Sequence, residues 1–455
     1  MSSFQLGGVG EMPRRLADRD AASRAVAVSE RLAAQDGGDR QGFAYNGCRH
    51  NGERPQRAAT ATGTAQGFTR LDGRTVDWDE ARALAHSVAE PLAPSLLDPA
   101  AAVGTTLARP LLALIDLPSF DRSAMDGYAV RGAPPWMIRG RVGAGQTAGP
   151  PLRPGEAREV ATGAPVPEGT DGVLPYEQAI RYEESVTAAT IAPAGRHVRR
   201  AGEECRRGEQ LAPVGTPVTP QLAALAAAVG NDLLEVHPRP LVGMLVTGDE
   251  LCSSGLPGPG AVRDAIGPML PGLIAWAGGQ PAGLTRLPDS DSALAAALEA
   301  GSGQVLLVSG SSSAGPADHL RPCLKRLGAE LLVDGVACRP GHPQSLARLP
   351  DGTLVIGLPG NPLAALVAFL TLAVPVLAGL RGEALSVPGT AHGPRLPRRA
   401  GTTTLVPVRV LAGVAEPVTH AGSAMLRGAA GADAIAVVGP GEGPVRLIAL
   451  PGGGY

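Results

Sequence analysis

The spacing of apolar residues changes several times along the chain, and the first change separates an extension from the folded part. Residues 1–72 are rich in Arg, Asp, Gln, Gly and Ala, and only residues 20–35 have an apolar spacing typical of a helix. A segment of this composition buries too little apolar surface to offset the entropy that it loses on ordering. We therefore expect a largely disordered N-terminal extension.

Two further patterns follow the extension. Between residues 75 and 94 apolar residues recur every three or four positions, which predicts a helix. Residues 111–202 contain short β-like runs separated by Gly and Pro, which predict a β-rich insert domain. The segments on either side of the insert, 73–110 and 203–238, are expected to form one linking domain of helices and strands.

From residue 239 onward β-like runs alternate with helical ones. This order predicts a three-layer α/β domain with a mainly parallel sheet over residues 239–385. The strands are expected within 240–251, 280–288, 304–315, 330–341 and 352–362, and the helices within 291–301, 317–329 and 362–380. Residues 386–455 return to short strands and predict a small C-terminal β-barrel-like domain. The predicted fold class is therefore multidomain, α+β and α/β.

Composition narrows the choice of partners. The formal net charge of −2 does not favour nucleic acid or an anionic membrane. Lys325 is the single lysine among 40 Lys and Arg residues, so an anion site must use Arg, backbone N–H groups and helix N-termini. The five cysteines include no C-x-x-C pair, which argues against a zinc site or a disulfide framework. Because no secretory leader is visible, we expect a cytoplasmic protein.

The candidate chemistry lies where the α/β strands end, because ligands of open α/β sheets bind beyond the carboxyl ends of the strands. Three loops there are informative: 247–250 ("TGDE"), 309–319 ("SGSSSAGPADH") and 357–362 ("GLPGNP"). Their glycines and hydroxyls admit a ligand close to the backbone. Asn361 is expected to N-cap a helix that begins with Pro362, and such a helix end favours an anion. Together the loops predict a ligand that carries phosphate.

Acidic residues in two of these loops predict a metal. Asp249 and Glu250 follow one strand, and Asp318 follows another. Carboxylates combined with substrate phosphates are the ligands that Mg²⁺ prefers, so the three acids are expected to hold that ion. Each of them also fits a helix cap or a solvated surface charge. His319 and His342 stand alone in the sequence, and neither is expected to bind a metal.

A second group of candidates lies in the insert. The stretch "SFDRSAMDGYAV" (119–130) places Asp121, Asp126 and Tyr128 in one glycine-containing loop, which is more than a surface turn requires. The segments 161–177 and 198–211 add prolines, acids and arginines. By spacing alone they are a β-turn and a charged turn. The loop at 119–130 therefore indicates a functional role that its local structure does not explain.

Seven segments of the chain form an ordered set: "PSFDRSAMDGYAV", "TGAPVPEGTDGVL", "RRAGEE", "TGDEL", the spaced "SG…S.AG.AD", "RPGHP" and "GLPGNPLAA". They stand in the order found in the molybdopterin molybdenumtransferase family. From about residue 75 to residue 455 the chain resembles that family and is similar to the E domain of gephyrin. The resemblance implies an enzyme that takes adenylylated molybdopterin and molybdate, releases AMP with Mg²⁺, and leaves molybdenum on the dithiolene. It also implies a four-domain homodimer, contact with other molybdenum cofactor biosynthesis proteins, and an active site between the α/β domain of one subunit and the insert of the other.

The resemblance assigns roles to individual residues. Asp126 corresponds to a key acid in the cleft wall from the second subunit, and it is expected to be catalytic together with Glu250 and Asp318. Asp289 aligns with another family acid across a short insertion. The resemblance and the strand-end loops together predict a cofactor-binding set of Ser123, Thr162, Glu204, Thr247, Gly248, Asp249, Ser309, Gly310, Ser313, Gly315, Arg339, Pro340, Gly341, His342, Pro359, Gly360, Asn361 and Pro362.

The chain departs from the family pattern in these loops. Ser311 replaces a glycine, Pro316 an acid and His342 a lysine, and Ala265 and Ile266 replace a Thr-Asn pair. A lysine donates charged hydrogen bonds to phosphate, whereas a neutral histidine is expected to donate one weaker bond. Two alternatives to the transferase remain. One is a weakened or inactive paralogue that binds molybdopterin or serves as a scaffold, and the other is a nucleotide-cleaving enzyme with the same α/β module.

Overall fold

The computed structural model describes residues 75–189, 193–310 and 319–453. The expected disordered extension at 1–72, with its helical pattern at 20–35, lies outside these residues. Part of the second strand-end loop lies outside them as well, so the predictions for the following residues are not addressed by the structure: Ser311, Ser313, Gly315, Pro316 and Asp318.

The first described helix, α2 (Trp78–Ser87), belongs to the core of the α/β domain. Asp77 begins it as the N-cap, and its carboxylate accepts a hydrogen bond from the Glu80 N–H at 2.8 Å. The buried face of α2 packs on the helix at 362–380. The predicted helix is therefore confirmed, but its assignment to the linking domain is wrong, because its apolar residues complete the α/β core.

The linking domain is built from two chain segments that the insert separates. Helix α3 (Pro220–Ala228) begins at its N-cap Thr219 and covers a small core that includes Leu107 and Val236. Its antiparallel pairs are β1 (Ser95–Leu97) with β13 (Leu234–His237), β13 with β2 (Thr106–Leu107), and β3 (Leu111–Leu112) with β12 (Gln210–Ala212). The two segments fold together as expected, and β3 extends the domain past residue 110.

The insert is a six-stranded sheet with a small core on each face. Along β5, Tyr128 and Val130 join one cluster while Ala129 joins the other, which is the alternation of a strand buried on both sides. In sheet order the strands are β8 (Gly172–Pro175), β5 (Gly127–Arg131), β7 (Glu156–Val160), β6 (Trp136–Val142), β10 (Ser185–Thr187) and β9 (Ile180–Tyr182). A turn of 3₁₀ helix, η1 (Tyr176–Gln178), follows β8, and β4 (Arg122–Ser123) pairs with β11 (Val198–Arg199). The predicted β-rich insert is confirmed.

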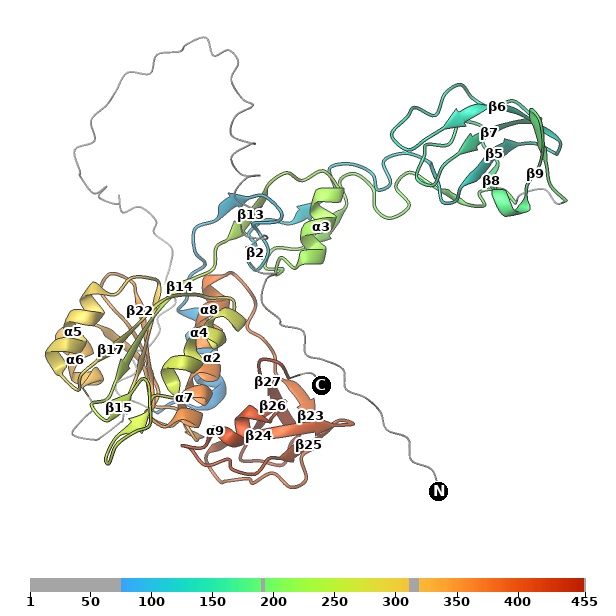
Figure 1. The fold of residues 1–455 in the computed structure, drawn as a ribbon. Helices are drawn as coiled ribbons and strands as arrows, with labels where there is room; N and C mark the ends of the chain where they lie inside the picture. Colours follow the sequence, from blue (N-terminus) through green and yellow to red (C-terminus); the bar gives the residue numbers. More distant parts are fainter. Residues whose placement is uncertain (1–74, 190–192, 311–318, 454–455) are drawn as a thin grey trace, which may run out of the picture. The chain divides into compact units, whose positions relative to one another are not determined.

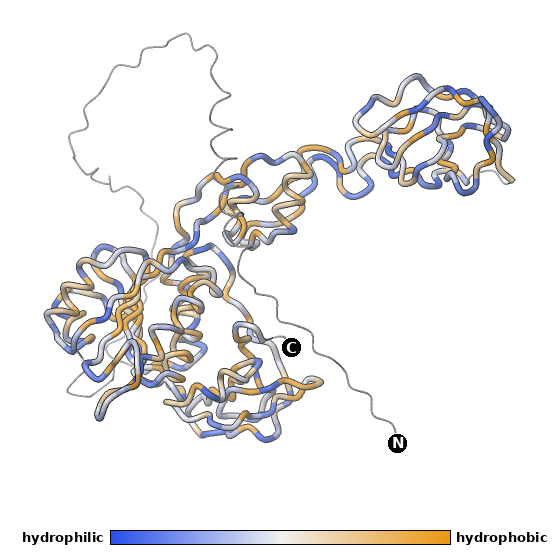
Figure 2. The backbone as a smooth tube through the Cα atoms, viewed as in Figure 1, coloured by the Kyte–Doolittle hydropathy of each residue, from blue (hydrophilic) through white to orange (hydrophobic). Residues whose placement is uncertain are grey.

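The α/β domain has three layers (Figure 1), and the three inner parallel strands of its sheet are hydrophobic along most of their length (Figure 2). Helices α5 and α6 cover one face of the sheet, and α4, α2 and the helix at 362–380 cover the other. The sheet order is β17 (Gln280–Leu287), β14 (Leu241–Thr247), β18 (Val305–Ser309), β22 (Leu354–Leu358), β21 (Ser345–Arg348) and β19 (Glu330–Asp334), of which the first four are parallel. The helices are α4 (Ile266–Trp276), α5 (Asp291–Ala300) and α6 (Leu320–Arg326), and a short pair, β15 (Leu251–Cys252) and β16 (Val262–Arg263), follows β14. The predicted doubly covered, mainly parallel sheet is confirmed.

The long apolar helix at 362–380 is continuous but changes its winding. It consists of α7 (Pro362–Ala368), a π-helical turn η2 (Phe369–Ala373) and α8 (Val374–Leu380). By length and composition these 19 residues could cross a membrane, but 94% of the apolar window is buried inside the protein. The helix therefore serves as a core element of the α/β domain.

The C-terminal domain is a mixed sheet that borrows one strand from the α/β segment. Strand β20 (Cys338–Arg339) runs parallel to β24 (Thr403–Leu411). The other members are β26 (Ala434–Val438), β27 (Val445–Ala449), β23 (Gly389–Ala391) and the side hairpin strand β25 (Val414–Pro417), with α9 (Leu426–Ala430) alongside. The predicted C-terminal β domain is confirmed, and β20 places the loop at 339–342 against it.

One buried hydrogen bond links α2 to the π turn and can be tested. The Trp78 Nε1–H donates to Thr371 Oγ1 at 3.1 Å, and both side chains are buried. Thr371→Val keeps the shape but leaves this indole N–H without an acceptor, so the free energy of unfolding should fall by about 1–3 kcal/mol. Thr371→Ser keeps the hydroxyl and should cost less in the same denaturant titration. Equal losses for the two variants would show that packing, and not the hydrogen bond, matters here.

Candidate functional site

The carboxyl ends of three parallel strands meet at one edge of the α/β sheet. Thr247 closes β14, and its hydroxyl donates to the Ser309 carbonyl of β18 at 2.8 Å. A Cβ added to Gly360, beyond β22, would lie 3.8 Å from the Gly310 Cα. The first loop, the start of the second and the third loop therefore come together as the sequence predicted. The Ser309 side chain is buried, and its hydroxyl has no partner among the described residues.

Gly310 is a glycine for a local physical reason. Its φ is +94°, and an added Cβ would lie 2.2 Å from Thr247 Oγ1. Any side chain would therefore strain the backbone and collide with the neighbouring strand end. The glycine keeps β14 and β18 close together at the edge where a ligand is expected.

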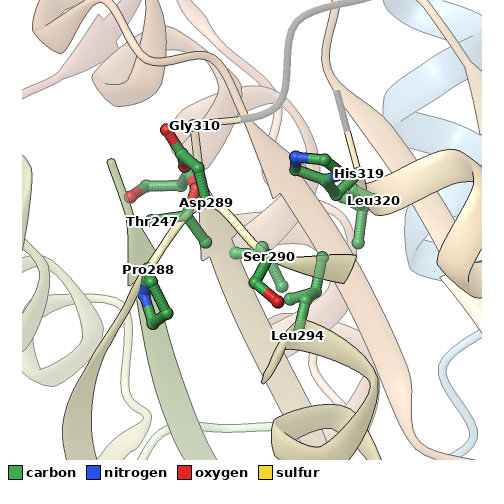
Figure 3. A pocket seen from close by; sticks show the side chains of 10 residues that line it. Thr247, Pro288, Asp289, Ser290, Leu294, Gly310, His319 and Leu320 are labelled. Atoms are coloured by element: carbon green, nitrogen blue, oxygen red, sulfur yellow. The ribbon is translucent and has the colours of Figure 1, made fainter. Parts of the chain in front are cut away.

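The strand ends enclose a small hollow of about 10 Å³ (Figure 3). Thr247, Asp289, Ser290, Gly310 and His319 are among the residues that line it. His319 looked isolated in the sequence, and the structure corrects this because the start of α6 brings its ring beside the loop after β17. The hollow has room for about one water molecule, so a larger ligand must lie over this edge.

Two carboxylates meet at this edge. The Asp289 N–H donates to Asp249 Oδ1 at 3.2 Å, and the Asp249 N–H donates to Asp289 Oδ2 at 3.4 Å. Glu250 follows directly and is exposed. Within residues 75–189, 193–310 and 319–453, no group of three or more His, Cys, Asp or Glu side chains could hold a metal ion. The donor set fits a hydrated Mg²⁺, which uses one or two carboxylates and completes its shell with waters and phosphate.

A larger cavity of about 560 Å³ lies between the loop at 338–343 and the C-terminal domain. Arg339 and His342 line it from the loop, and Arg399, Thr404 and Ser423 line it from the C-terminal domain. Thr404 is 8% exposed, and its hydroxyl has no partner among the described residues. The described lining contains no Asp or Glu. Positive groups together with an unused hydroxyl suit an oxyanion.

The loop at 338–343 is held rigidly. The buried Gln344 amide donates to the Gly341 carbonyl at 2.9 Å and to Cys338 Sγ at 3.3 Å. Gly341 has φ +104°, and an added Cβ would lie 3.1 Å from Val367 Cγ1. Burial raises the pKa of the Cys338 thiol to about 12, so this group stays uncharged at neutral pH. Arg339 and His342 therefore project from a fixed backbone.

The positive end of α7 is not open to a phosphate, which corrects the sequence prediction. The Leu363 and Ala364 N–H groups donate to the Ser423 carbonyl at 3.0 and 3.1 Å. Asn361 occupies the N-cap position and Pro362 the first turn, as expected, but the Asn361 side chain makes no capping bond. Its amide instead donates to Ser423 Oγ at 3.4 Å. The C-terminal domain thus satisfies the helix end that the sequence assigned to a ligand.

The tautomer of His342 also differs from expectation. His342 Nδ1 lies 2.8 Å from the Val336 carbonyl oxygen. A carbonyl oxygen only accepts, so Nδ1 must carry the proton in this contact. The neutral ring then has a lone pair on Nε2 and cannot donate to an anion there. The sequence-based expectation of one weak hydrogen bond from a neutral histidine is therefore wrong.

The loop at 119–130 is organised around Asp126. The Asp126 Oδ1 accepts the Thr162 N–H at 2.7 Å, which joins two predicted site residues, and both are exposed. A Cβ on Gly127 would lie 2.0 Å from the Leu174 carbonyl oxygen, so this position requires glycine. Ser123 is 1% exposed, and its hydroxyl donates to the Met125 carbonyl at 2.5 Å. The hydroxyl thus stabilises its own loop, and its contact with a ligand stays a prediction.

Asp121 in the same stretch links the chain segment that enters the insert to the segment that leaves it. Its carboxylate accepts hydrogen bonds from the Arg200 guanidinium at 2.5 Å and the Ala201 N–H at 2.8 Å. Partial burial would raise the pKa of Asp121, but the Ala201 N–H and Arg200 outweigh it and hold that pKa below its usual value. Nearby, Glu204 is exposed, and its N–H donates to the Leu117 carbonyl at 2.9 Å. Asp121 is thus a structural acid, whereas Asp126 remains a candidate for chemistry.

Sequence reasoning missed several residues of the large cavity. Arg399, Thr404 and Ser423 lie in the C-terminal domain and belong to no motif that marks a ligand. Nothing in their spacing distinguishes them from turn or strand residues. The parallel pairing of β20 with β24 brings that domain to the loop at 338–343, and a long-range pairing of this kind leaves no local signal.

The fold is that of a multidomain protein with a mainly parallel α/β sheet, a small hollow at the strand ends and a larger cavity lined by two arginines. Three family models match the chain: the MoeA N-terminal region (domain I and II) over residues 76–230, the probable molybdopterin binding domain over 243–379, and the MoeA C-terminal region (domain IV) over 393–446. The chain belongs to the molybdopterin molybdenumtransferase family.

Relatives and solved structures agree with this placement. A molybdopterin molybdenumtransferase from Synechococcus elongatus is 36% identical over 299 residues, which cover 62% of this chain and 74% of that protein. The Bacillus subtilis molybdopterin molybdenumtransferase is 33% identical over 288 residues, covering 60% and 67%. A crystal structure of the molybdopterin biosynthesis MoeA protein from Pyrococcus horikoshii has a TM-score of 0.67 at 27% identity, covering 82% of this chain and 99% of that one.

The close approach at Gly310 generates a prediction with a matched control. Gly352 lies in the same domain with φ +93° and nothing within 4 Å of an added Cβ. Gly352→Ala should therefore cost only the left-handed strain, about 1–2 kcal/mol. Gly310→Ala should cost a further 1–3 kcal/mol or so, because the methyl collides with Thr247. Denaturant unfolding of both variants measures the difference, and equal costs would show that the two strand ends can separate freely.

Proposed function

We propose that this chain is a molybdopterin molybdenumtransferase, which inserts molybdate into adenylylated molybdopterin and releases AMP. The observation that carries the proposal is the family membership shown by residues 76–230, 243–379 and 393–446, since the curated relatives bear this name. The acid-lined sheet edge and the arginine-lined cavity support it, because the reaction handles a phosphoanhydride and an oxyanion. We place the enzyme in the cytoplasm.

The proposed chemistry relies mainly on positioning and charge. A water oxygen adds to phosphorus, the bond between the AMP phosphate and the pterin phosphate breaks, and AMP leaves. The two dithiolene thiols replace two oxo groups of molybdate, which leave as water, and the oxidation state of molybdenum does not change.

Asp249 and Asp289 would hold a hydrated Mg²⁺ beside these phosphates. Glu250 and Asp318 are proposed to bind waters of that ion. When bound, the ion neutralises phosphate charge. Thr247 and the backbone at Gly310 would fix the ligand at the strand ends, and a fixed polar site of this kind favours the charged transition state.

Arg339, Arg399 and Ser423 are proposed to hold the second anionic group in the large cavity. Two guanidinium groups supply charge, and the Thr404 hydroxyl supplies a hydrogen bond that it does not use elsewhere among the described residues. This arrangement fits a tetrahedral oxyanion better than an apolar group. The described walls of this cavity contain no general acid or base besides His342, which agrees with catalysis by positioning.

The alternative is a weakened paralogue that binds molybdopterin without efficient turnover. The specific observation in its favour is the His342 tautomer, which leaves no N–H toward an anion while the ring is neutral. Offering adenylylated molybdopterin, Mg²⁺ and molybdate to the full chain separates the two functions. Release of AMP with appearance of molybdenum on the pterin supports the transferase. Saturable binding of the pterin without AMP release supports the paralogue.

In the same assay Asp126→Asn should lower turnover by roughly a hundredfold or more, the range for loss of one positioned electrostatic group. Asparagine keeps an oxygen for the Thr162 N–H, so the melting temperature should stay unchanged. Asp171→Asn is the matched control, because Asp171 likewise accepts one backbone N–H, from Gly132 at 2.7 Å, outside the proposed site. An unaltered rate for Asp126→Asn, or equal losses in both variants, would remove Asp126 from the catalytic set.

We further propose a homodimer that works with other molybdenum cofactor biosynthesis proteins and completes each site from two subunits. Asp126→Asn and Glu250→Gln chains should each be nearly inactive alone. Unfolded together and refolded as a mixture, they should recover about a quarter of the wild-type rate, because half of the dimers are mixed and each of these holds one complete site. An active monomer in light scattering, or no recovery in mixtures shown to contain mixed dimers, would contradict the shared site.

A further inference from the structure

His342 occupies a position where only its charged form can bind an anion. Its ring lines the cavity of about 560 Å³ and also an adjoining cavity of about 340 Å³. The Nδ1–H is committed to the Val336 carbonyl at 2.8 Å. An anion near Nε2 meets a lone pair when the ring is neutral and an N–H donor when it is charged.

The charged groups around the His342 ring bear on how a bound anion changes the charge of that ring. Arg339 stands on the same loop, and Arg399 lines the cavity from the C-terminal domain. A bound anion places a negative charge beside the ring and favours its charged form. The described residues of α7 and β24 that line the cavity include no titratable side chain.

Other charged groups nearby are already compensated. Gly335 adjoins the ring, since an added Cβ would lie 3.5 Å from His342 Cε1. The preceding Asp334 is paired with Arg321 from α6, Nε to Oδ1 at 2.5 Å. Cys338 keeps its proton, because burial raises its pKa to about 12. A bound anion is therefore the group most able to change the charge of this ring.

We propose that the large cavity captures a tetrahedral oxyanion together with one proton, which His342 takes up on Nε2. The inference rests on the proposed function only for the choice of anion, which is free molybdate or the phosphate ester of the pterin. Because the bound form carries more protons than the free form, affinity rises as pH falls through the range in which the free ring is neutral. It levels off once the free ring is itself charged. A histidine here makes anion capture sensitive to pH, unlike a permanently charged residue.

The test is calorimetric titration of the full chain with inorganic molybdate between pH 6 and 8.5. Two buffers of different ionisation enthalpy at each pH give the number of protons taken up. The wild type should tighten by up to about tenfold per pH unit on acidification, with uptake approaching one proton. His342→Lys should bind more tightly at pH 8 and depend little on pH. His342→Gln should bind weakly at every pH.

His392→Gln is the control, because His392 is exposed in the C-terminal domain and does not line either cavity. It should reproduce the wild-type pH dependence. A competition arm with inorganic phosphate shows which oxyanion the cavity prefers, and displacement of molybdate assigns the pterin phosphate as a ligand of the same subsite. Failure of displacement assigns molybdate, and either result supports an oxyanion there.

Three results would overturn the inference. The first is wild-type binding without proton uptake, and the second is an unchanged pH slope in His342→Gln. The third is no binding of molybdate or phosphate by wild type at any pH, with the fold intact by circular dichroism. None of them decides the proposed function, which the AMP-release assay measures separately. Proton-linked binding without AMP release would instead favour the paralogue and leave the role of His342 standing.

Discussion

Burial of the helix at 362–380 is the constraint on which the rest of the structure depends. Its apolar residues contact the parallel sheet on one side and α2 on the other, and 94% of the apolar window is buried. Removal of apolar surface from water is the main favourable term in folding, and this helix contributes many residues to the buried core. The same helix begins directly after β22, so its packing fixes the position of the loop at 357–362.

The first turn of this helix also fixes which residues of the C-terminal domain line the cavity at the loop 338–343. The Ser423 carbonyl accepts the first free N–H groups of α7, and β20 adds a strand to the C-terminal sheet. These two connections bring Arg399 and Thr404 to the loop at 338–343. A helix end that could have bound a phosphate is thereby used to build a wall of the cavity of about 560 Å³. The positive charge at this cavity comes from arginine side chains.

Structural and chemical roles divide sharply within single motifs. In the stretch at 119–130, Asp121 links the chain segments that enter and leave the insert, Ser123 serves its own loop, and Asp126 remains exposed with one oxygen bonded to Thr162. In the loop at 338–343, Gln344 and Gly341 supply rigidity, while Arg339 and His342 face the cavity. In each motif some polar residues stabilise the loop itself, and one or two remain available for the proposed ligand.

The sequence by itself determined the domain order, the parallel sheet and the three strand-end loops, because these follow from local apolar periodicity and from turn residues at strand ends. It also indicated Asp126, Asp249 and Glu250 through motifs that are contiguous in the chain. Only the tertiary structure decided that α2 joins the α/β core, that Asp289 meets Asp249, that Ser423 covers the end of α7, and that His342 holds its proton on Nδ1. Each of these depends on a contact between segments far apart in sequence, and local patterns carry no information about such contacts.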